Sequence, residues 1–476
     1  MSALWTSAEI AAATRGRATA DFAATGVSID SRSIAKGDLF VALAGPSFDG
    51  HDFVATALAA GASGALVHRL PAGLAADAPV VVAADTLQAL GDLGRAARGR
   101  TSARIVAVTG SVGKTSTKEA LRSVLQAQAP TFATIGNLNN HWGAPLSLAR
   151  MPREVAFGVF ELGMNHAGEI SPLSQMVRPQ VAVITNVEAV HIEFFKSVAE
   201  IADAKAEIMD GLGTDGTVVL PRDNPHFARL VRHASDRGIK RILSFGADAA
   251  ADVRLIECQV GTDGNRVTAE MFGRRLAYSM GTPGRHFALN SLAVLAAVEA
   301  LGADVARAAL AYAEVAPLKG RGKRESIAVA GGTLILIDES YNANPAAVRA
   351  ALAVLGGIEP EGRGRRIAVL GDMRELGDAG PQLHRELAAD LVAAGIDRAF
   401  LVGPLMRGLH DGLPPAMRGA WTATSGAMVD PLLRAVGAGD LVLVKGSLGT
   451  RMAPLVEALR GLDVTAPPRP KAANGH

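Results

Sequence analysis

Short apolar runs alternate with amphipathic segments along most of the chain. After residue 102, strand-length runs such as RIVAVTG, VAFGVFELG and VAVITNV are each followed by a segment with the apolar spacing of a helix. This alternation is typical of a parallel sheet covered by helices on both faces. A stretch with more strand character, from DVRLIECQV to RRLAYSM, precedes the helix expected at HFALNSLAVLAAVEAL.

The same pattern divides the chain into three α/β units. Residues 1–101 carry strands at GDLFVAL, GALVHR and PVVVAAD, with a helix at DFVATALAAGA between the first two. The segment LGRAARGRTSARI that follows is rich in Arg, Gly and Ser, so we interpret it as a linker. Residues 102–316 form the central unit, and a second alternation of strands and helices occupies residues 317–476.

The segment VAVTGSVGKTSTKE joins an apolar strand to a helix through a turn that contains glycine. The segment matches the end of the common phosphate-binding pattern G-x-x-x-x-G-K-[ST]. At the position of the first glycine of that pattern, however, this sequence has a valine. A strand, a tight turn and a helix N-terminus still present N–H groups and a positive dipole end to an anion. The alternative is an ordinary connection with an exposed lysine. We favour a nucleotide site formed by Gly110, Ser111, Val112, Gly113, Lys114, Thr115 and Ser116.

In this site Lys114 would reach the β- and γ-phosphates, and the hydroxyl of Thr115 would ligate Mg²⁺. The expected fold class is therefore α/β in three domains. A small α/β N-terminal domain precedes a central P-loop-type ATPase domain with a parallel sheet, and a Rossmann-like α/β domain follows.

Composition narrows the class of protein further. A chain of 476 residues exceeds a single core and suits about three domains. Its net charge of +2, without blocks of like charge, supplies no strong field for nucleic acid. The single cysteine, Cys258, excludes an internal disulfide framework and is interpreted as a buried strand residue. Without a signal-peptide core or an apolar run of about 18 residues, we expect a soluble, cytoplasmic protein with no membrane insertion.

Polar residues follow the apolar strands of the central unit, where open parallel sheets bind their ligands. Glu161 ends one strand, and a carboxylate there can hold Mg²⁺ directly or through water. Asn186, Glu188 and His191 follow the next strand, although a lone histidine is more often structural than a ligand. Lys205 shares a helix face with apolar residues, and such a lysine usually extends its amine to water.

Nine segments, in chain order, resemble the Mur ligases. They are TGSVGKTSTKE, GNLNNHWGAP, ELGMNHAGEI, TNVEAVH, AKAEI, HFALNS, DESYNANP, LGDMRELG and VKGSLGTRM. The segment DSRSIAKGDLFVALAGPSFDGHDF resembles the N-terminal uridine-nucleotide domain of the family. The resemblance covers nearly the whole chain, and the short TGxxGKT loop is the family's own form. Among the Mur ligases, the resemblance is greatest to the member that adds D-alanyl-D-alanine to UDP-N-acetylmuramoyl-tripeptide.

The resemblance implies an ATP-dependent ligase that forms an amide through an acyl phosphate in peptidoglycan precursor synthesis. Lys114 and Thr115 would take the ATP phosphates and a first Mg²⁺, and Glu161 and His191 would lie at a second Mg²⁺. Lys205 matches the lysine that this family carries as a carbamate. An ammonium beside two divalent cations would be repelled, whereas a carbamate can approach them.

Further contacts are implied on the other domains. Asn290, Arg321 and Asp338 resemble residues near the nucleotide. Glu339 stands where the family often has a second Asp, so either of the two carboxylates could face the nucleotide. The residues expected to meet the substrates are Ser31 and Arg32 on the UDP-muramyl-peptide, and Asn342, Asn344, Asp372 and Lys445 on D-alanyl-D-alanine. For the last four, the alternative is turn and capping chemistry.

Two other functions stay open at this point. Another ligase of the superfamily would add diaminopimelate or lysine one step earlier, or glutamate to a folate, but the C-terminal domain has no D-N-P-R segment. A nucleotide-gated switch would need a guanine-reading N-K-x-D motif, which the sequence lacks. The third residue of the tripeptide, diaminopimelate or lysine, is left open, and we expect a monomer.

Overall fold

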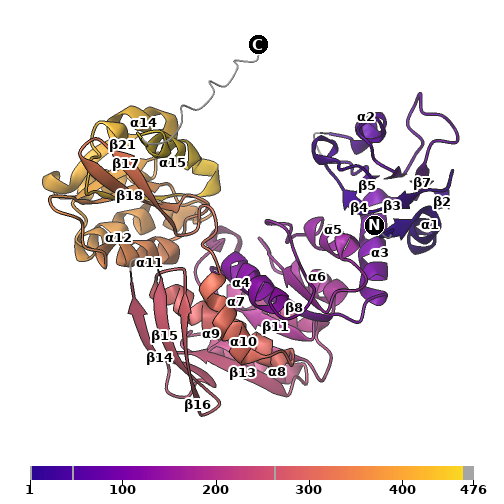
Figure 1. The fold of residues 1–476 in the computed structure, drawn as a ribbon, viewed down its shortest axis with the longest axis horizontal. Coiled ribbons are helices and arrows are strands. Elements are labelled where there is room, and N and C mark those ends of the chain that lie inside the picture. Colours follow the sequence, from indigo (N-terminus) through magenta and orange to yellow (C-terminus); the bar gives the residue numbers. More distant parts are fainter. Residues whose placement is uncertain (1–2, 46–47, 262–263, 465–476) are drawn as a thin grey trace.

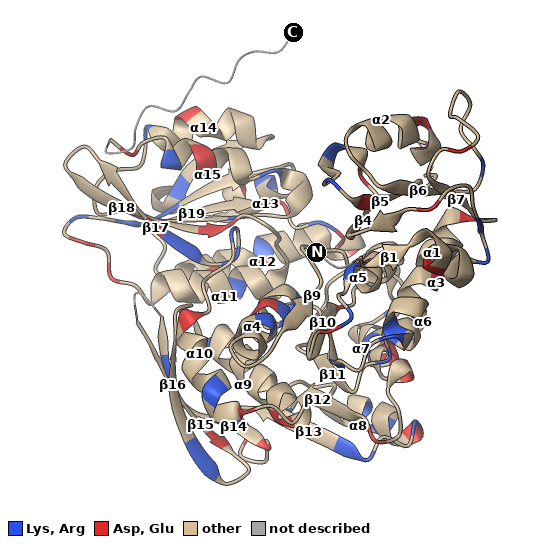
Figure 2. Ribbon diagram, turned by 45° about the vertical axis from the view of Figure 1, so that its right-hand side comes forward, with Lys and Arg blue, Asp and Glu red and all other residues tan. Residues whose placement is uncertain are grey.

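A computed structural model describes residues 3–45, 48–261 and 264–464. In Figure 1 the chain runs from an indigo N-terminal domain through a magenta central domain to an orange and yellow C-terminal domain. Each domain has its own, mainly parallel sheet. The prediction of an α/β protein with three domains is therefore confirmed. Figure 2 shows basic and acidic residues interspersed on all three domains.

The N-terminal domain is built on a small sheet at the start of the chain. Its strands, in spatial order, are β2 (Arg17–Ala18), β7 (Val80–Val82), β6 (Gly64–Val67), β5 (Asp38–Val41) and β4 (Gly26–Ser28). Strands β4 to β7 run parallel, and β2 pairs antiparallel at the edge. A separate pair and two helices complete the domain: β1 (Trp5–Thr6), β3 (Ala23–Ala24), α1 (Ser7–Thr14) and α2 (Val54–Ala59).

The expected linker after the N-terminal domain is wrong, because most of that segment is helix α3 (Thr86–Gly99). Leu90 and Ala97 lie on its buried face, so the Arg- and Gly-rich sequence conceals an amphipathic helix. Gly94 is a contact point: a Cβ there would lie 3.1 Å from the Cα of Pro145 in the next helix layer. Glycine here permits close helix packing and does not mark a break.

Helix α3 also joins the first two domains through a common core. One hydrophobic cluster contains Trp5 of the N-terminal domain, Leu93 of α3 and Phe160 of the central sheet. The indole Nε1 of Trp5 donates to the carbonyl of Ala149 at 2.8 Å. The guanidinium of Arg100 stacks 3.6 Å above the same indole ring. The N-terminal and central domains therefore pack as one body.

The central domain contains a large sheet whose strands alternate their side chains between two cores. Its strands, in spatial order, are β16 (Arg274–Met280), β15 (Asn265–Met271), β14 (Val253–Val260), β13 (Arg241–Gly246), β12 (Thr217–Pro221), β11 (Val181–Ile184), β8 (Arg104–Thr109), β10 (Phe157–Glu161) and β9 (Thr131–Ala133). The pairing is parallel from β9 to β14 and antiparallel from β14 to β16. The expected β-rich stretch is thus an extension of the sheet.

Helices cover both faces of this sheet, as the alternating pattern predicts. On β8, Ile105 and Ala107 face one cluster, whereas Val106 and Val108 face the other. The helices are α4 (Lys114–Gln126), α5 (Gly143–Arg150), α6 (Ile170–Val177), α7 (Val198–Ala206), α8 (Phe227–Asp236), α9 (Arg285–Ala300) and α10 (Val305–Ala311). Cys258 lies on β14 and is only partly buried.

The C-terminal domain has its own sheet and its own cores. Its strands, in spatial order, are β17 (Lys323–Val329), β18 (Gly332–Glu339), β22 (Leu441–Lys445), β19 (Arg366–Gly371), β20 (Arg398–Val402) and β21 (Arg418–Thr422). All neighbours are parallel except β17 and β18. Its helices are α11 (Pro345–Gly356), α12 (Gly380–Ala393), α13 (Met406–Gly412), α14 (Ser425–Leu433) and α15 (Ala453–Arg460). Within the described residues, no helix of the protein is long and apolar enough to cross a bilayer.

Candidate active site

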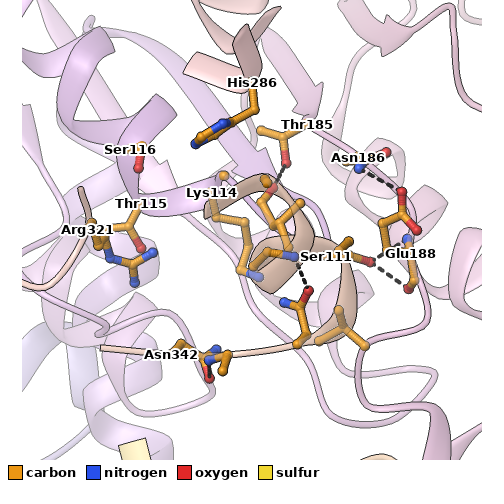
Figure 3. A pocket seen from close by; sticks show the side chains of 18 of the residues that line it. Ser111, Lys114, Thr115, Ser116, Thr185, Asn186, Glu188, His286, Arg321 and Asn342 are labelled. Atoms are coloured by element: carbon orange, nitrogen blue, oxygen red, sulfur yellow. Dashed lines mark hydrogen bonds between the residues drawn. The ribbon is translucent and has the colours of Figure 1, made fainter. Parts of the chain in front are cut away.

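A cleft of about 730 Å³ lies between the central and C-terminal domains. One wall is formed by the carboxyl ends of β8, β10, β11 and β12 and by the start of α4. The other wall is formed by the carboxyl ends of β18 and β22 and by the start of α11. Both walls are therefore strand ends of the kind that bind ligands in parallel sheets. In Figure 3 the side chains of Lys114, Arg321 and Asn342 come from different elements and point toward the same space.

The turn between β8 and α4 requires glycine at two positions. Gly110 and Gly113 adopt positive φ angles of 148° and 83°. A Cβ at Gly110 would lie 1.9 Å from Oγ1 of Thr185, and one at Gly113 would lie 2.7 Å from Nδ2 of Asn290. Gly113 is the N-cap of α4, so no capping side chain covers the first N–H groups of the helix. The turn is thus compact and suited to an anion.

Lys114 is the first residue of α4 and lies over this turn. Its Nζ donates to the carbonyl of Gly110 at 2.6 Å. Burial lowers the pKa of Lys114, the negative charge of Glu161 opposes that shift, and Arg321 adds to it. Thr115 and Ser116 also line the cleft, as the sequence predicts. On the far side of the turn, Oγ of Ser111 donates to the carbonyl of Glu188 at 3.0 Å (Figure 3).

Glu161, the last residue of β10, has one carboxylate oxygen held and one without a partner. Its side chain is buried, and Oε1 accepts a hydrogen bond from Nδ2 of Asn139 at 2.7 Å. Among the described residues, Oε2 has no hydrogen-bond partner. A buried carboxylate oxygen is costly unless a cation or a donor reaches it, so Glu161 fits a cation ligand. The site prediction missed Asn139, although GNLNNHWGAP was a signal for it.

Lys205 is buried near Lys114, and the half-buried His191 lies near both lysines. Lys205 on α7 is only 2% exposed and does not line the cleft. Burial holds the pKa of Lys205 well below its ordinary value, and the charge of Lys114 lowers it further. Burial also lowers the pKa of His191 to about 4, with Lys114 and Lys205 adding to the shift. The imidazole therefore favours its neutral form at neutral pH, and burial disfavours the charged form of the amine.

The side chains that could hold a metal ion do not form a complete cluster within the described residues. No group of three or more His, Cys, Asp or Glu side chains able to hold a metal ion occurs in the part of the chain that the structure describes. Thr115, Glu161 and His191 nevertheless lie along the same cleft. A cation there would need ligands from elsewhere, such as phosphate oxygens or a modified lysine.

The nucleotide-side predictions on other elements also lie at the cleft. Asn290 of α9 contacts the turn at Gly113, and Arg321 stacks on the ring of Tyr341 at 4.3 Å. His286 lines the same cleft and was missed, although it opens the segment HFALNS. Burial lowers the pKa of this imidazole below its ordinary value.

The strand end at β18 carries two neighbouring carboxylates, Asp338 and Glu339, which the structure places in different surroundings. Asp338 is buried and does not line the cleft. Its carboxylate accepts hydrogen bonds from Oγ of Ser340 at 2.6 Å and from the guanidinium of Arg460 at 3.2 Å. Glu339 lines the cleft instead, and its Oε2 accepts from Nζ of Lys445 at 3.0 Å. Successive strand residues face opposite sides, so of the two carboxylates that the sequence left open, Glu339 and not Asp338 lies in the cleft.

Asp372 also departs from its predicted use. Its carboxylate accepts from the backbone N–H groups of Met406 at 3.0 Å and Leu405 at 3.4 Å. Asp372 is absent from the lining residues of the cleft, and burial raises the pKa of its carboxyl. The expected substrate contact is therefore replaced by capping chemistry near the start of α13.

The remaining C-terminal predictions do line the cleft. Asn344 caps α11 by accepting from the N–H of Ala347 at 2.9 Å. Lys445 is 2% exposed and donates from Nζ to the carbonyl of Asn342 at 3.0 Å. Asn342, Asn344 and Lys445 therefore share the C-terminal wall.

Ser31 and Arg32 lie away from this cleft. They form a short 3-10 helix directly after β4, at the carboxyl edge of the N-terminal sheet. The guanidinium of Arg32 makes a two-pronged contact with Asp30, at 2.9 and 2.7 Å, and its side chain is 88% exposed. Their contact with a muramyl nucleotide stays a prediction.

Comparison with known proteins finds matches along the chain. Residues 23–98 match the family model "Mur ligase family, catalytic domain", residues 108–298 match "Mur ligase middle domain", and residues 324–448 match "Mur ligase, glutamate ligase domain".

Whole-length similarity extends across all three domains. A UDP-N-acetylmuramoyl-tripeptide–D-alanyl-D-alanine ligase of Escherichia coli is 36% identical, over 93% of this chain and 95% of its own. A crystal structure of MurF from Acinetobacter baumannii has a TM-score of 0.84 and 31% identity, covering 96% of this chain and 99% of that one. MurF ligase of Thermotoga maritima in complex with ADP has a TM-score of 0.77 and 26% identity, covering 92% and 97%.

Proposed function

The chain belongs to the Mur ligase family, and on that premise we propose that it joins D-alanyl-D-alanine to UDP-N-acetylmuramoyl-tripeptide. ATP drives the reaction and leaves as ADP and phosphate. The observation that carries this proposal is the cleft, which places the TGSVGKTS turn opposite the strand ends of SYNANP and VKGS. In this proposal the central wall activates the carboxylate, and the C-terminal wall binds the amine substrate.

The first step activates the terminal carboxylate of the tripeptide. A carboxylate oxygen forms a bond to the γ-phosphorus of ATP while the bond from that phosphorus to the ADP oxygen breaks. Lys114 and the first N–H groups of α4 stabilise the charge that gathers on the transferred phosphoryl group. Arg321 and Asn290 bound the same part of the cleft, where they help to orient the nucleotide.

In the second step the amine of D-alanyl-D-alanine attacks the acyl carbon. The C–N bond forms, the tetrahedral intermediate collapses, phosphate leaves and the proton from nitrogen passes to solvent. Asn342, Asn344 and Lys445 line the C-terminal wall and offer donors and acceptors for the dipeptide's carboxylate and amide. A polar site of this kind disfavours a single D-alanine, which would leave buried groups unpaired.

The residues of the cleft fit Mg²⁺. The unpartnered Oε2 of Glu161, the hydroxyl of Thr115 and the imidazole of His191 would hold it at two positions. When bound, Mg²⁺ supplies positive charge that neutralises the phosphate oxygens. Keeping His191 neutral preserves its lone pair for this role.

We include in the proposal that Lys205 works as a carbamate. Burial lowers the pKa of this amine and so increases the share of its unprotonated form, which is the form that can attack carbon dioxide. A bond forms between Nζ and the carbon, the π pair of one C=O bond moves onto oxygen, and one amine proton passes to solvent. The product carries a carboxylate where a buried amine stood, which suits a site that attracts cations.

The UDP-muramyl moiety is assigned to the N-terminal domain. Ser31 and Arg32 lie at the carboxyl edge of its sheet, and an arginine suits a diphosphate or a carboxylate. The proposal also includes a monomeric protein in the cytoplasm. Sedimentation of the purified protein and fractionation of cells test these two parts separately.

Phosphate release measured with a panel of amines is the decisive experiment. With ATP and Mg²⁺, release should require UDP-N-acetylmuramoyl-tripeptide and D-alanyl-D-alanine together. Parallel reactions contain diaminopimelate, lysine, glutamate or D-alanine as the amine. Preference for diaminopimelate or lysine on the UDP-muramyl-dipeptide would move the protein one step earlier in the pathway. Preference for glutamate on a folate would remove it from cell-wall synthesis.

A further inference from the structure

A lysine inside α4 has no part in the reaction as described above. Lys118 lies one turn after Lys114, and its side chain is completely buried. Figure 2 shows α4 beside β9 and β10, at the edge of the central sheet. Lys118 is not among the residues that line the cleft. A buried ammonium is costly, so its partners indicate what it holds in place.

Those partners come from α4 itself and from the segment after β9. Nζ of Lys118 donates to Oε1 of Glu119 at 2.5 Å and to the carbonyl of Thr134 at 2.8 Å. A longer contact of 3.5 Å reaches the carbonyl of Gly136. Glu119 is itself held by Nε of Arg122 at 2.7 Å. The ammonium therefore joins the nucleotide helix to the first residues of a loop.

That loop, residues 134–139, is named here the asparagine loop because it carries Asn137 and Asn139. Both asparagines line the cleft. Nδ2 of Asn139 holds Oε1 of Glu161, and the carbonyl of Asn139 accepts from the N–H of Gly163 at 2.9 Å. A Cβ at Gly163 would lie 2.9 Å from Cγ of Asn139, so the loop packs closely on the segment after β10.

We propose that Lys118 is a positioning residue for the reaction. Its buried ammonium ties the asparagine loop to the helix that carries the phosphate turn, and the loop in turn holds the carboxylate of Glu161. The effect of Lys118 on turnover rests on the proposed function, because it acts through the role given there to Glu161. The tie between Lys118 and the loop rests only on the hydrogen bonds described above.

The chain offers a matched control in Arg98 of α3. This side chain is also buried, and it donates to the carbonyls of Val177 at 2.7 Å and Arg178 at 2.9 Å. It is a buried cation that holds backbone carbonyls, and it does not line the cleft. Lys118→Met and Arg98→Met therefore remove similar interactions, one tied to the asparagine loop and the other not.

Amide hydrogen exchange measured by mass spectrometry is the first readout. Peptides that cover residues 134–141 should exchange at least about tenfold faster in Lys118→Met than in the parent, since local opening governs exchange. The same peptides should be unchanged in Arg98→Met. Equal protection of this loop in the parent and in folded Lys118→Met would overturn the proposal.

Steady-state kinetics supply the second readout. The kcat of Lys118→Met should fall about 10- to 100-fold, the range seen when a residue that supports a ligand is lost. KM for ATP should stay near the parent value, because the phosphate turn is intact. Asn139→Ala should reproduce the loss of kcat, and the double variant should be no worse than either single one. Additive losses would show that Lys118 does not act through Asn139.

Two further comparisons keep the outcomes separate. If Lys118→Met does not fold, Lys118→Gln, which keeps one amide donor, is held to the same criteria, and unchanged exchange and kcat in it would overturn the proposal. If the parent protein does not release phosphate as expected in the amine panel, the proposed function is contradicted. The hydrogen-exchange result would still test whether Lys118 holds the asparagine loop. Equal losses of kcat in Arg98→Met and Lys118→Met would show a general effect on stability and would also overturn the proposal.

Discussion

The two walls of the cleft differ in how far their polar side chains are already satisfied. On the central wall, Oε2 of Glu161 has no hydrogen-bond partner among the described residues, and near Lys114 burial lowers the pKa of Lys205, which does not itself line the cleft. In the C-terminal domain, Asp338 and Asp372 accept hydrogen bonds from the domain's own groups and do not line the cleft. A strand end therefore identifies the cleft, but existing hydrogen bonds decide which side chains remain available to a ligand.

The largest effect should come from the central wall, at the phosphate turn. Lys114→Ala removes the positive charge that stabilises the transferred phosphoryl group, so its rate should fall below about one tenth of the parent rate. Melting should stay close to that of the parent, because Lys114 makes one hydrogen bond to the turn. Lys196→Ala, at an exposed lysine of the same domain, is the control. A folded Lys114→Ala that retains most of the activity would contradict the assigned role.

The second prediction concerns Lys205. It tests whether the central domain gains a cation ligand when this lysine is converted to a carbamate. Lys205→Ala should be inactive, and short carboxylic acids should partly restore activity by occupying the vacated space. Nuclear magnetic resonance with ¹³C-bicarbonate should show a carbamate carbon in the parent and none in Lys205→Ala. An active parent saturated with bicarbonate but lacking that signal would exclude the carbamate.

A pair of neighbours on β18 sharpens the comparison within the C-terminal wall. Glu339→Gln should raise KM for a substrate by about tenfold or more, since a hydrogen bond to a charged group is worth about 1.5–3 kcal/mol. Asp338→Asn should lower the free energy of unfolding by about 1–3 kcal/mol, because a buried interaction with Arg460 is weakened. Its kinetics per folded molecule should match the parent. Reversal of these two phenotypes would restore Asp338 as the carboxylate at the nucleotide.

The smallest effect should appear at Asp372 and should depend on pH. Burial raises the pKa of this carboxyl above its ordinary value of 3.8, so the folded state favours the protonated form. Its contribution to stability is fully present below pH 3.8 and is lost as pH rises through the raised pKa. Relative to the parent, Asp372→Asn should therefore become more stable as pH rises, by about 1 kcal/mol, the size of an ordinary hydrogen bond.

Denaturant midpoints of the parent and Asp372→Asn, measured from pH 3 to pH 7, check this expectation. The difference between the two proteins should change only at the acidic end of that range. A difference that is constant with pH would show that the carboxyl titrates alike in the folded and unfolded states. Kinetics should not change, because the side chain does not line the cleft.

Much of the fold follows from the sequence because its signals are local. The strand, glycine turn and helix around Lys114 were predicted, since backbone geometry at Gly110 and Gly113 leaves few alternatives. Helix α3 is not evident in the sequence because Gly weakens a helix, and the partner surface that accommodates Gly94 lies far away in sequence.

The sequence predicts which residue types the site contains, but not which way each side chain points. A run such as IDES places two carboxylates at a strand end, yet only the neighbours decide that Asp338 meets Arg460 and Glu339 meets Lys445. Lys118 shows the same limit, because its partner carbonyl at Thr134 is a backbone atom without a sequence signature. Contacts between segments distant in sequence account for what local patterns cannot supply.

The continuous core between the first two domains has a consequence for the design of ligands. Trp5, Leu93 and Phe160 share that core, so relative motion of these domains would expose packed apolar surface. A molecule that bridges the carboxyl edge of the N-terminal sheet and the phosphate turn would therefore meet two surfaces already fixed in distance. A molecule that bridges the turn and the C-terminal strand ends must also bear the entropy of ordering two separately packed bodies. For equal contact area, we expect the first kind of inhibitor to bind more tightly.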